Sequence, residues 1–151
     1  MRIVIDAFGG DNAPKSNVLG AALAYEKFGV DITLTGDEKA INKIISENSL
    51  DLGPNFKIVD TKEVFDMHEE PTSILKEHIN SSLGKAFTEL AEDRADALVS
   101  AGSTGAIVVG GTLIVKRIKG IKRPALAGIM PSPDGNYMLM DMGANSDCRP
   151  E

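Results

Sequence analysis

The sequence has one cysteine, two histidines and no tryptophan among its 151 residues. A lone Cys148 excludes an internal disulfide, and no cysteine and histidine cluster has the spacing of a structural zinc site. No apolar run approaches the ~20 residues that a membrane-spanning helix needs. The charged N-terminus also lacks the apolar stretch of a signal peptide. We therefore expect a cytoplasmic protein that binds no metal.

Positive charge is scarce as well. Sixteen basic side chains stand against 22 acidic ones, which gives a formal net charge of −6. Nucleic-acid binding needs a basic face, so no nucleic-acid partner is expected. The only cationic cluster is KRIKGIKRP, at residues 116–124. It is explained either by the favourable effect of positive charge at a helix C-terminus or by a docking patch for an acidic partner.

Short apolar runs alternate with helical patterns along the chain. The strands are expected at residues 2–7, 32–35, 56–59 and 95–99, and a hairpin around SPDG joins strands at 125–130 and 137–140. The helices are expected from a cap at Asp11 or Asn12 to Gly29, after Gly36-Asp37, after Ser81 or Ser82, and at 107–118. This order predicts a three-layer α/β/α fold with a mostly parallel sheet. Residues 61–80 read as a long irregular loop, which is more often functional or mobile than filler.

Three glycine-containing turns follow predicted strands, and they carry the candidate chemistry. They are DAFGGDNAP at 6–14, SAGSTGA at 100–106 and DMGANSD at 141–147. The carboxyl ends of parallel strands share one edge of a sheet, so we expect the three turns to converge there. Neither the P-loop pattern nor the G-x-G-x-x-G dinucleotide pattern is present.

The 100–106 turn is the best candidate for holding a phosphate-bearing ligand. Gly102 and Gly105 allow close approach of the backbone. Ser100, Ser103 and Thr104 offer hydroxyl donors beside the unpaired N–H groups of a helix start. The alternative is that the glycines only permit tight packing and that Ser103 or Thr104 is a plain helix cap.

Two aspartates and one asparagine in these turns are candidates for a direct role. Asp6 and Asp141 could bind a cation, orient a donor or act as a base; the alternative is that each caps a turn through its side chain. Asn145 could donate its amide to a substrate oxygen, or it is only a turn residue.

The last residues lay down a strand, a glycine turn and the start of a helix. We therefore expect that the chain is truncated, or that it is one portion of a longer protein.

Several motifs together resemble one family, the bacterial phosphate acyltransferases of phospholipid synthesis (the PlsX family). The matching segments, in the same order along the chain, are MRIVIDAFGGDNAP, DMHEEP, NSS, ADALVSAGSTGA, GIKRPALAGIMP and MDMGANSDCRPE. Two positions depart from the family pattern. Ser103 stands where asparagine is usual, and residues 76–80 are much less basic than their counterpart.

The resemblance implies a fold like that of isocitrate and isopropylmalate dehydrogenases and phosphotransacetylases. It implies a homodimer that converts acyl-[acyl carrier protein] and inorganic phosphate to acyl phosphate without a cofactor. It implies that residues 1–151 are the N-terminal portion of one longer α/β domain. It also implies loose membrane attachment through the other half of the protein. The rivals are a phosphotransacetylase-like or NAD-dependent enzyme on the same fold, or a non-catalytic ligand-binding fragment.

The mechanism that this family implies needs only positioning of the reactants and stabilisation of an oxyanion. The candidate catalytic residues are Asp6, Ser103, Asp141 and Asn145. The candidate phosphate-binding residues are Gly9, Gly10, Asp11, Asn12, Ser81, Ser82, Gly102, Thr104, Gly105 and Gly143.

Overall fold

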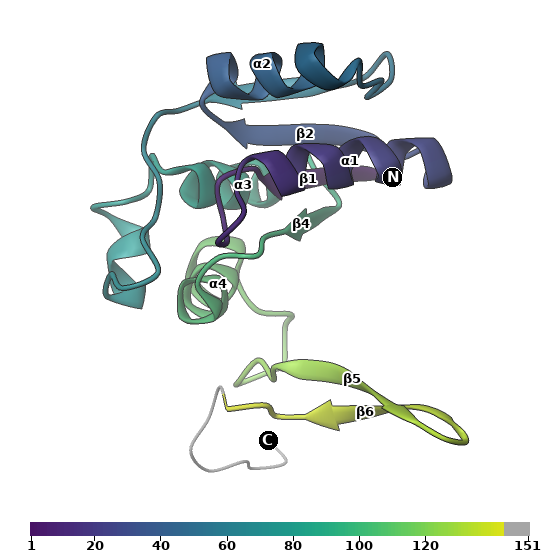
Figure 1. Cartoon of the computed structure of the whole chain (residues 1–151). Helices are drawn as coiled ribbons and strands as arrows, with labels where there is room; N and C mark the ends of the chain where they lie inside the picture. The colour runs from purple at the N-terminus through teal and green to yellow at the C-terminus, as the bar shows by residue number, and fades with distance from the viewer. Residues whose placement is uncertain (144–151) are drawn as a thin grey trace.

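A four-stranded parallel sheet forms the centre of the molecule in the computed structural model, which describes residues 1–143 (Figure 1). The strand order is β3-β2-β1-β4. The strands are β1 (Arg2–Asp6), β2 (Asp31–Gly36), β3 (Lys57–Asp60) and β4 (Ala97–Val99). All three strand pairs are parallel, and in the β1–β4 pair Ile5 lies opposite Val99. The predicted parallel sheet is thus confirmed.

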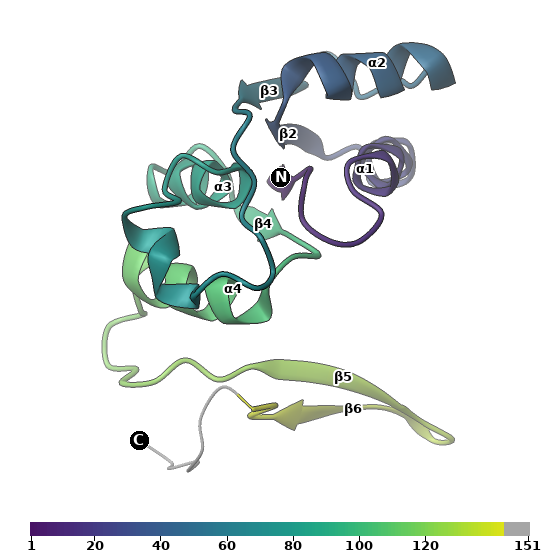
Figure 2. The same cartoon turned by 60° about the vertical axis from the view of Figure 1, so that its left-hand side comes forward.

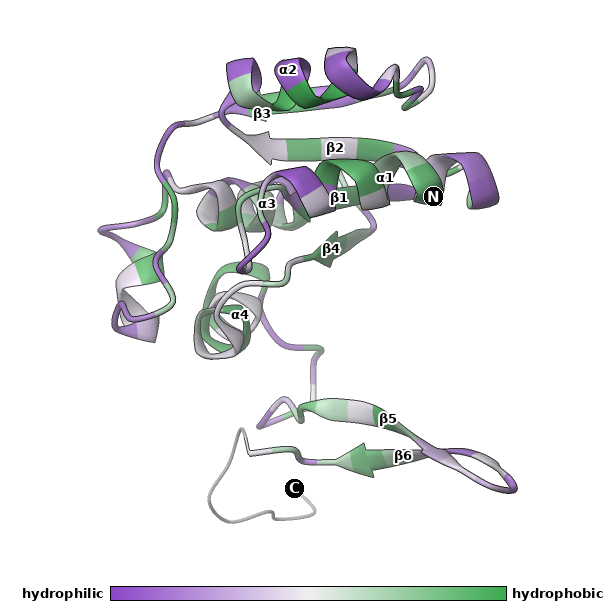
Figure 3. Cartoon of the chain, in the orientation of Figure 1, coloured by the Kyte–Doolittle hydropathy of each residue, from purple (hydrophilic) through white to green (hydrophobic). Residues whose placement is uncertain are grey.

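Helices cover both faces of this sheet. Figure 2 shows α1 (Lys15–Phe28) and α2 (Glu38–Asn48) on one face and α3 (Ser82–Ala91) on the other. Figure 3 shows that α2 turns its hydrophobic residues towards the sheet and its hydrophilic residues outwards. The predicted three-layer α/β/α arrangement is confirmed, whereas the likeness to the dehydrogenases and phosphotransacetylases stays a prediction.

The core consists mostly of aliphatic side chains on the two faces of the sheet. On the α1 and α2 face, Ile32, Leu34 and Ile41 are fully buried. On the α3 face, Val4 packs with Ala86. Burial of one such Ile, Leu or Val side chain contributes ~1.5–3 kcal/mol, so this packing fixes the strand ends that carry the candidate turns.

Helix boundaries follow the expected residues at most ends. Gly29 closes α1 in the left-handed conformation, with φ of 62°, and Asp37 caps α2 by accepting from the backbone N–H groups of residues 39 and 40. The start of α1 differs from the prediction. Pro14 occupies the cap position without a side-chain cap, and Asn12 accepts a hydrogen bond from Ser16 N through its backbone carbonyl oxygen.

The remaining helical segments lie on the β4 side of the sheet. The 61–80 segment is not wholly irregular, because a 3-10 helix, η1 (Pro71–Leu75), begins at its proline. The helix after the 100–106 turn is α4 (Thr104–Gly110), which continues as a π-helix, η2 (Gly111–Val115). It therefore begins and ends three residues earlier than predicted. Within residues 1–143, no helix has the length and apolar character needed to cross a membrane.

The C-terminal strands form a sheet of their own. β5 (Ala127–Ser132) and β6 (Gly135–Met140) pair antiparallel around the predicted turn, and α4 lies between this hairpin and the parallel sheet (Figures 1 and 2). Every residue of β6 is exposed, including Met138 at 62% and Met140 at 60%. A two-stranded sheet with so little covered surface is marginally stable by itself.

Candidate active site

The carboxyl ends of β1 and β4 bring two of the three predicted turns together. Because Ile5 pairs with Val99, the next residues on the two strands, Asp6 and Ser100, become neighbours. The Ser100 hydroxyl donates to Asp6 Oδ2 at 2.8 Å and accepts from Gly102 N at 3.1 Å. Asp6 Oδ1 accepts from Phe8 N at 3.2 Å. One buried carboxylate therefore ties the 6–14 turn to the 100–106 turn.

The backbones of these two turns pack almost atom on atom at Gly9. A Cβ added there would lie 2.5 Å from Asp6 Oδ2 and 2.9 Å from Gly102 N. Gly10, with φ of +94°, lies against Ala101 in the same way. Asp11 and Asn12 follow at the exposed rim of the loop. The predicted neighbourhood of the two turns is therefore present in the structure, and it depends on glycine at residue 9.

Asn17 holds the 6–14 turn in place, and the sequence pattern alone did not reveal it. Its side-chain Nδ2 lies within hydrogen-bond distance of three backbone carbonyl oxygens, those of Asp6, Ala7 and Gly9, at 3.1, 3.1 and 2.8 Å. The available signal was an amide side chain in the first turn of a helix that directly follows a glycine loop. Ser100, predicted only as a hydroxyl donor to a ligand, is the second residue whose structural role went unrecognised.

The 100–106 turn begins α4 through a side-chain cap. Ser103 Oγ accepts from Ala106 N at 3.3 Å, so Ser103 is a helix cap, as one of the two interpretations of this serine predicted. The hydroxyl hydrogen of Ser103 is not used in that bond and can still be donated to an anion. Thr104 is exposed beside it. Gly105 lies under Pro71, whose Cγ would be 2.8 Å from a Cβ added at this glycine.

The 141–147 turn does not follow a parallel strand as predicted, because β6 belongs to the separate antiparallel hairpin. Gly143 nevertheless reaches the second turn. Gly143 and Met142 line a pocket of about 420 Å³ together with Thr104, Gly105 and Pro71. Its further lining residues are Val108, Val109 and Leu126.

The structure describes one of the two candidate catalytic residues of the 141–147 turn. Asp141 Oδ1 accepts from Leu126 N at 3.1 Å and so helps to close the base of the hairpin. Asn145 lies outside the described residues, as does Cys148.

Ser81 and Ser82 lie at the start of α3, and both side chains are buried. The Ser81 hydroxyl donates to the His78 carbonyl oxygen at 2.6 Å and accepts from Gly84 N at 3.2 Å as the cap of α3. Ser82 Oγ has no hydrogen-bond partner among the described residues. The Ser81 hydroxyl is thus used to cap the helix, whereas the Ser82 hydroxyl is available to form a hydrogen bond.

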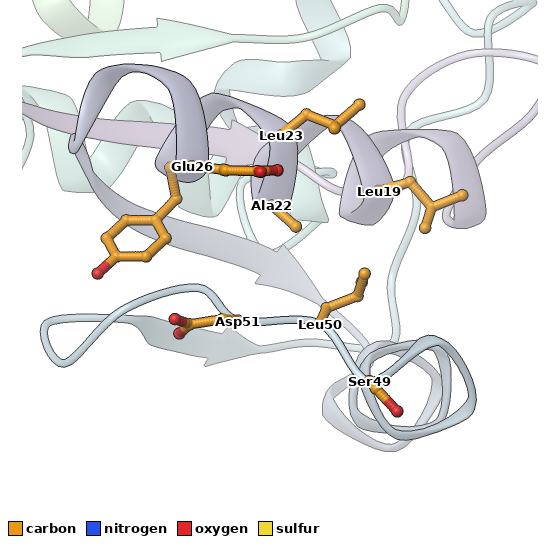
Figure 4. Close-up of a pocket in the computed structure, with 8 residues that line it drawn as sticks. Leu19, Ala22, Leu23, Glu26, Ser49, Leu50 and Asp51 are labelled. Atoms are coloured by element: carbon orange, nitrogen blue, oxygen red, sulfur yellow. The ribbon is translucent and has the colours of Figure 1, made fainter.

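A larger pocket, of about 560 Å³, lies away from these turns between α1 and the α2–β3 connection (Figure 4). Leu19, Leu23 and Leu50 line it together with the carboxylates Glu26 and Asp51. None of its lining residues belongs to the three predicted turns, so the strand-end turns remain the candidate site. Among residues 1–143, no three acidic, histidine or cysteine side chains gather in a way that could hold a metal ion.

The fold and the joined strand-end turns define an α/β protein with a glycine-lined candidate site for an anion. Comparison with known proteins is more specific: the whole chain, residues 1–151, matches the model of the family described as "Fatty acid synthesis protein", and the chain belongs to that family. The resemblance noted in the sequence is thereby confirmed.

Three relatives from different bacteria carry the same name. The chain is 42% identical over 152 residues to the phosphate acyltransferase of Clostridioides difficile, covering 100% of this chain and 44% of the relative. It is 44% identical over 153 residues to the phosphate acyltransferase of Bacillus pumilus, and this match covers 100% of this chain and 45% of the relative. It is 44% identical over 151 residues to the phosphate acyltransferase of Caldicellulosiruptor bescii, and this match covers 99% of this chain and 45% of the relative. The chain therefore spans less than half the length of these relatives.

Proposed function

We propose that the chain is the N-terminal portion of a phosphate acyltransferase that converts acyl-[acyl carrier protein] and inorganic phosphate to acyl phosphate. The acyl phosphate then supplies phosphatidic acid synthesis. The observation that carries this proposal is membership of the family, with relatives of 42–44% identity named phosphate acyltransferase. The glycine-lined contact between two strand-end turns supports it, because such turns let backbone N–H groups approach an anion closely.

The proposed reaction needs no covalent enzyme intermediate and no cofactor. A phosphate oxygen attacks the thioester carbonyl carbon, and a tetrahedral oxyanion forms. The carbon–sulfur bond then breaks, and the carrier thiolate takes the proton that the hydrogen phosphate gives up. The chain's task is to hold phosphate beside the thioester and to place N–H and O–H donors at the oxyanion.

The 100–106 turn is the proposed holder of phosphate or of the oxyanion, through Gly102, Ser103, Thr104 and Gly105. Gly9 and its neighbours in the 6–14 turn form the adjoining wall, and Gly143 lines the same pocket as Thr104 and Gly105. Asp6 acts by positioning, since both its oxygens already accept hydrogen bonds. We place Asn145, Asp141 and Ser82 in the same site as weaker members.

A substitution at Gly105 tests this assignment. We expect Gly105→Val to abolish phosphate-dependent thioester cleavage in the full-length enzyme, because even a Cβ meets Pro71 at 2.8 Å. The control is Gly111→Val, at a position where nothing lies within 4 Å of a Cβ. Acyl phosphate is measured with and without added phosphate, which separates acyl transfer from simple hydrolysis. Full activity of a folded Gly105→Val enzyme would refute the assignment.

The proposal includes a homodimer, a cytoplasmic location and loose attachment to the membrane surface through the remainder of the protein. The exposed hairpin supports further assembly, because Ile129, Met138 and Met140 are 71%, 62% and 60% exposed. Light scattering of the full-length protein tests the dimer. A monomer at micromolar concentration would contradict it.

A further inference from the structure

The segment between η2 and β5, residues 116–123, concentrates positive charge on an otherwise acidic chain. We call it the basic loop. Its five cations are Lys116, Arg117, Lys119, Lys122 and Arg123, and it contains no acidic residue. Figure 3 shows it as a largely hydrophilic stretch that leads from the α4 region to the hairpin. This is the cluster for which the sequence left two explanations open.

The effect of charge at a helix C-terminus does not account for the whole loop. That effect fades within the last helical turn, and η2 ends at Val115. Lys119 and Arg123 lie beyond its reach. Within residues 1–143, Lys116, Lys119 and Arg123 form no ion pair, so their charge is not consumed by the fold.

The loop has a defined shape in addition to its charge. Ile121 N donates to the Ile118 carbonyl oxygen at 3.0 Å across a turn whose Gly120 has φ of +95°. Arg117 closes the loop by donating to the Lys122 carbonyl oxygen. These two bonds hold Lys119 and Lys122 on a short, closed turn that directly follows Lys116.

Apolar groups stand among the cations. Ile118 is 80% exposed and Ile121 is 51% exposed. Both line a concave pocket of about 440 Å³ together with Leu113, Thr112, Lys116 and Lys119. A cationic rim around a small apolar hollow fits a protein surface that has acidic side chains around an apolar one, and it fits a flat lipid surface less well.

We propose that the basic loop is the docking surface for the acidic carrier protein that delivers the acyl group; this rests on the proposed acyl transfer. The loop lies at the far end of the α4–η2 helix from the 100–106 turn. The twelve residues 104–115 give a separation of roughly 18 Å. A carrier protein holds its acyl group on a long flexible arm, so docking at this distance leaves the thioester free to reach the turn.

The test reverses two charges of the loop in the full-length enzyme. We compare Lys116→Glu/Lys119→Glu with Lys39→Glu/Lys57→Glu, which changes the net charge equally at exposed residues of α2 and β3. The loop variant should raise the KM for acyl carrier protein about tenfold, leaving the KM for phosphate and the rate with a small acyl thioester unchanged. The control variant should change none of these.

Two substitutions of exposed apolar residues by serine test the role of the apolar pocket. Ile118→Ser should raise the KM for acyl carrier protein by about fivefold. Leu23→Ser, at a position 65% exposed on α1, should not. Thermal unfolding checks that all variants keep the fold.

Two results overturn the proposal. One is an unchanged KM in the loop variant, which would assign the loop to a lipid surface if binding to phosphatidylglycerol vesicles is lost as well. The other is an equal rise of the KM in the control variant. If the wild-type enzyme forms no acyl phosphate, acyl transfer itself fails. Direct binding of free carrier protein to wild type and loop variant then decides the docking proposal independently.

Discussion

Replacing Gly9 by alanine perturbs the contact between the two strand-end turns and little else. The added Cβ would lie 2.5 Å from Asp6 Oδ2, 2.7 Å from Ser100 Oγ and 2.9 Å from Gly102 N. Ordinary contact begins at 3.4 Å, so the 6–14 turn must retreat by about 0.5–0.9 Å. Asp6 and Ser100 cannot simply rotate away, because each is fixed by its hydrogen bond to the other. Gly102 N belongs to the backbone and cannot rotate at all.

The expected magnitude follows from this displacement. Overpacking of this kind costs about 1–3 kcal/mol of stability, and a 1 Å misplacement in an active site can cost about 100-fold in rate. We therefore expect Gly9→Ala to lower the Tm and to reduce phosphate-dependent acyl phosphate formation about 100-fold in the full-length enzyme. Residual activity should show a raised KM for phosphate.

Gly20→Ala is the matched control for Gly9→Ala. It lies in α1 with nothing within 4 Å of its Cβ position, so it should raise stability by about 0.5–1 kcal/mol and leave activity unchanged. The assays are thermal unfolding and acyl phosphate release at varied phosphate. Wild-type stability and activity in Gly9→Ala would refute the close packing, and equal losses in both variants would refute its link to the turns.

Two other predictions concern stability. Ser81→Ala should lower the free energy of unfolding in denaturant by about 1–2 kcal/mol, because it removes the cap of α3. Ser82→Ala should leave this free energy unchanged, because it removes a buried hydroxyl that has no partner. A similar loss in both variants would contradict this prediction. Hydrogen bonds from Arg2 lower the pKa of Asp96 to about 2 from 3.8. The stability that this lowered pKa contributes is present above pH 3.8 and is lost as the pH falls towards 2. Between these pH values the free energy of unfolding of Asp96→Asn should therefore fall less steeply with pH than that of wild type, and equal slopes would contradict the prediction.

The parallel sheet and its helices could be predicted because local signals and packing agree there. β1 and β2 are short apolar runs that become buried, and Gly29 and Asp37 end and begin helices by their backbone and side-chain chemistry. Convergence of the 6–14 and 100–106 turns then follows from parallel pairing alone. The motif resemblance added the family, which the comparison confirms.

The features that were missed depend on contacts between distant residues. The hairpin gives a clear turn signal, but whether its strands join the main sheet depends on pairing that no local pattern reveals. Asn17 reaches back to carbonyl oxygens up to 11 residues away, and Ser100 meets Asp6 across 94 residues of chain. Such side chains look like ordinary polar residues until the fold brings their partners near.

The charge balance of the two joined turns indicates which part of the proposed site this chain can supply. Asp6 is 2% exposed and lies directly behind Gly9 and Gly102. A unit negative charge about 4 Å from an ionised carboxylate is repelled by about 4 kcal/mol at an effective dielectric of 20. The carboxylate accepts hydrogen bonds from the Ser100 hydroxyl and from Phe8 N, which offset part of its charge, but the turns themselves contribute no lysine or arginine. We therefore expect the N–H groups and hydroxyls of these turns to orient the proposed phosphate, and the positive charge that tightens its binding to come from outside the two turns.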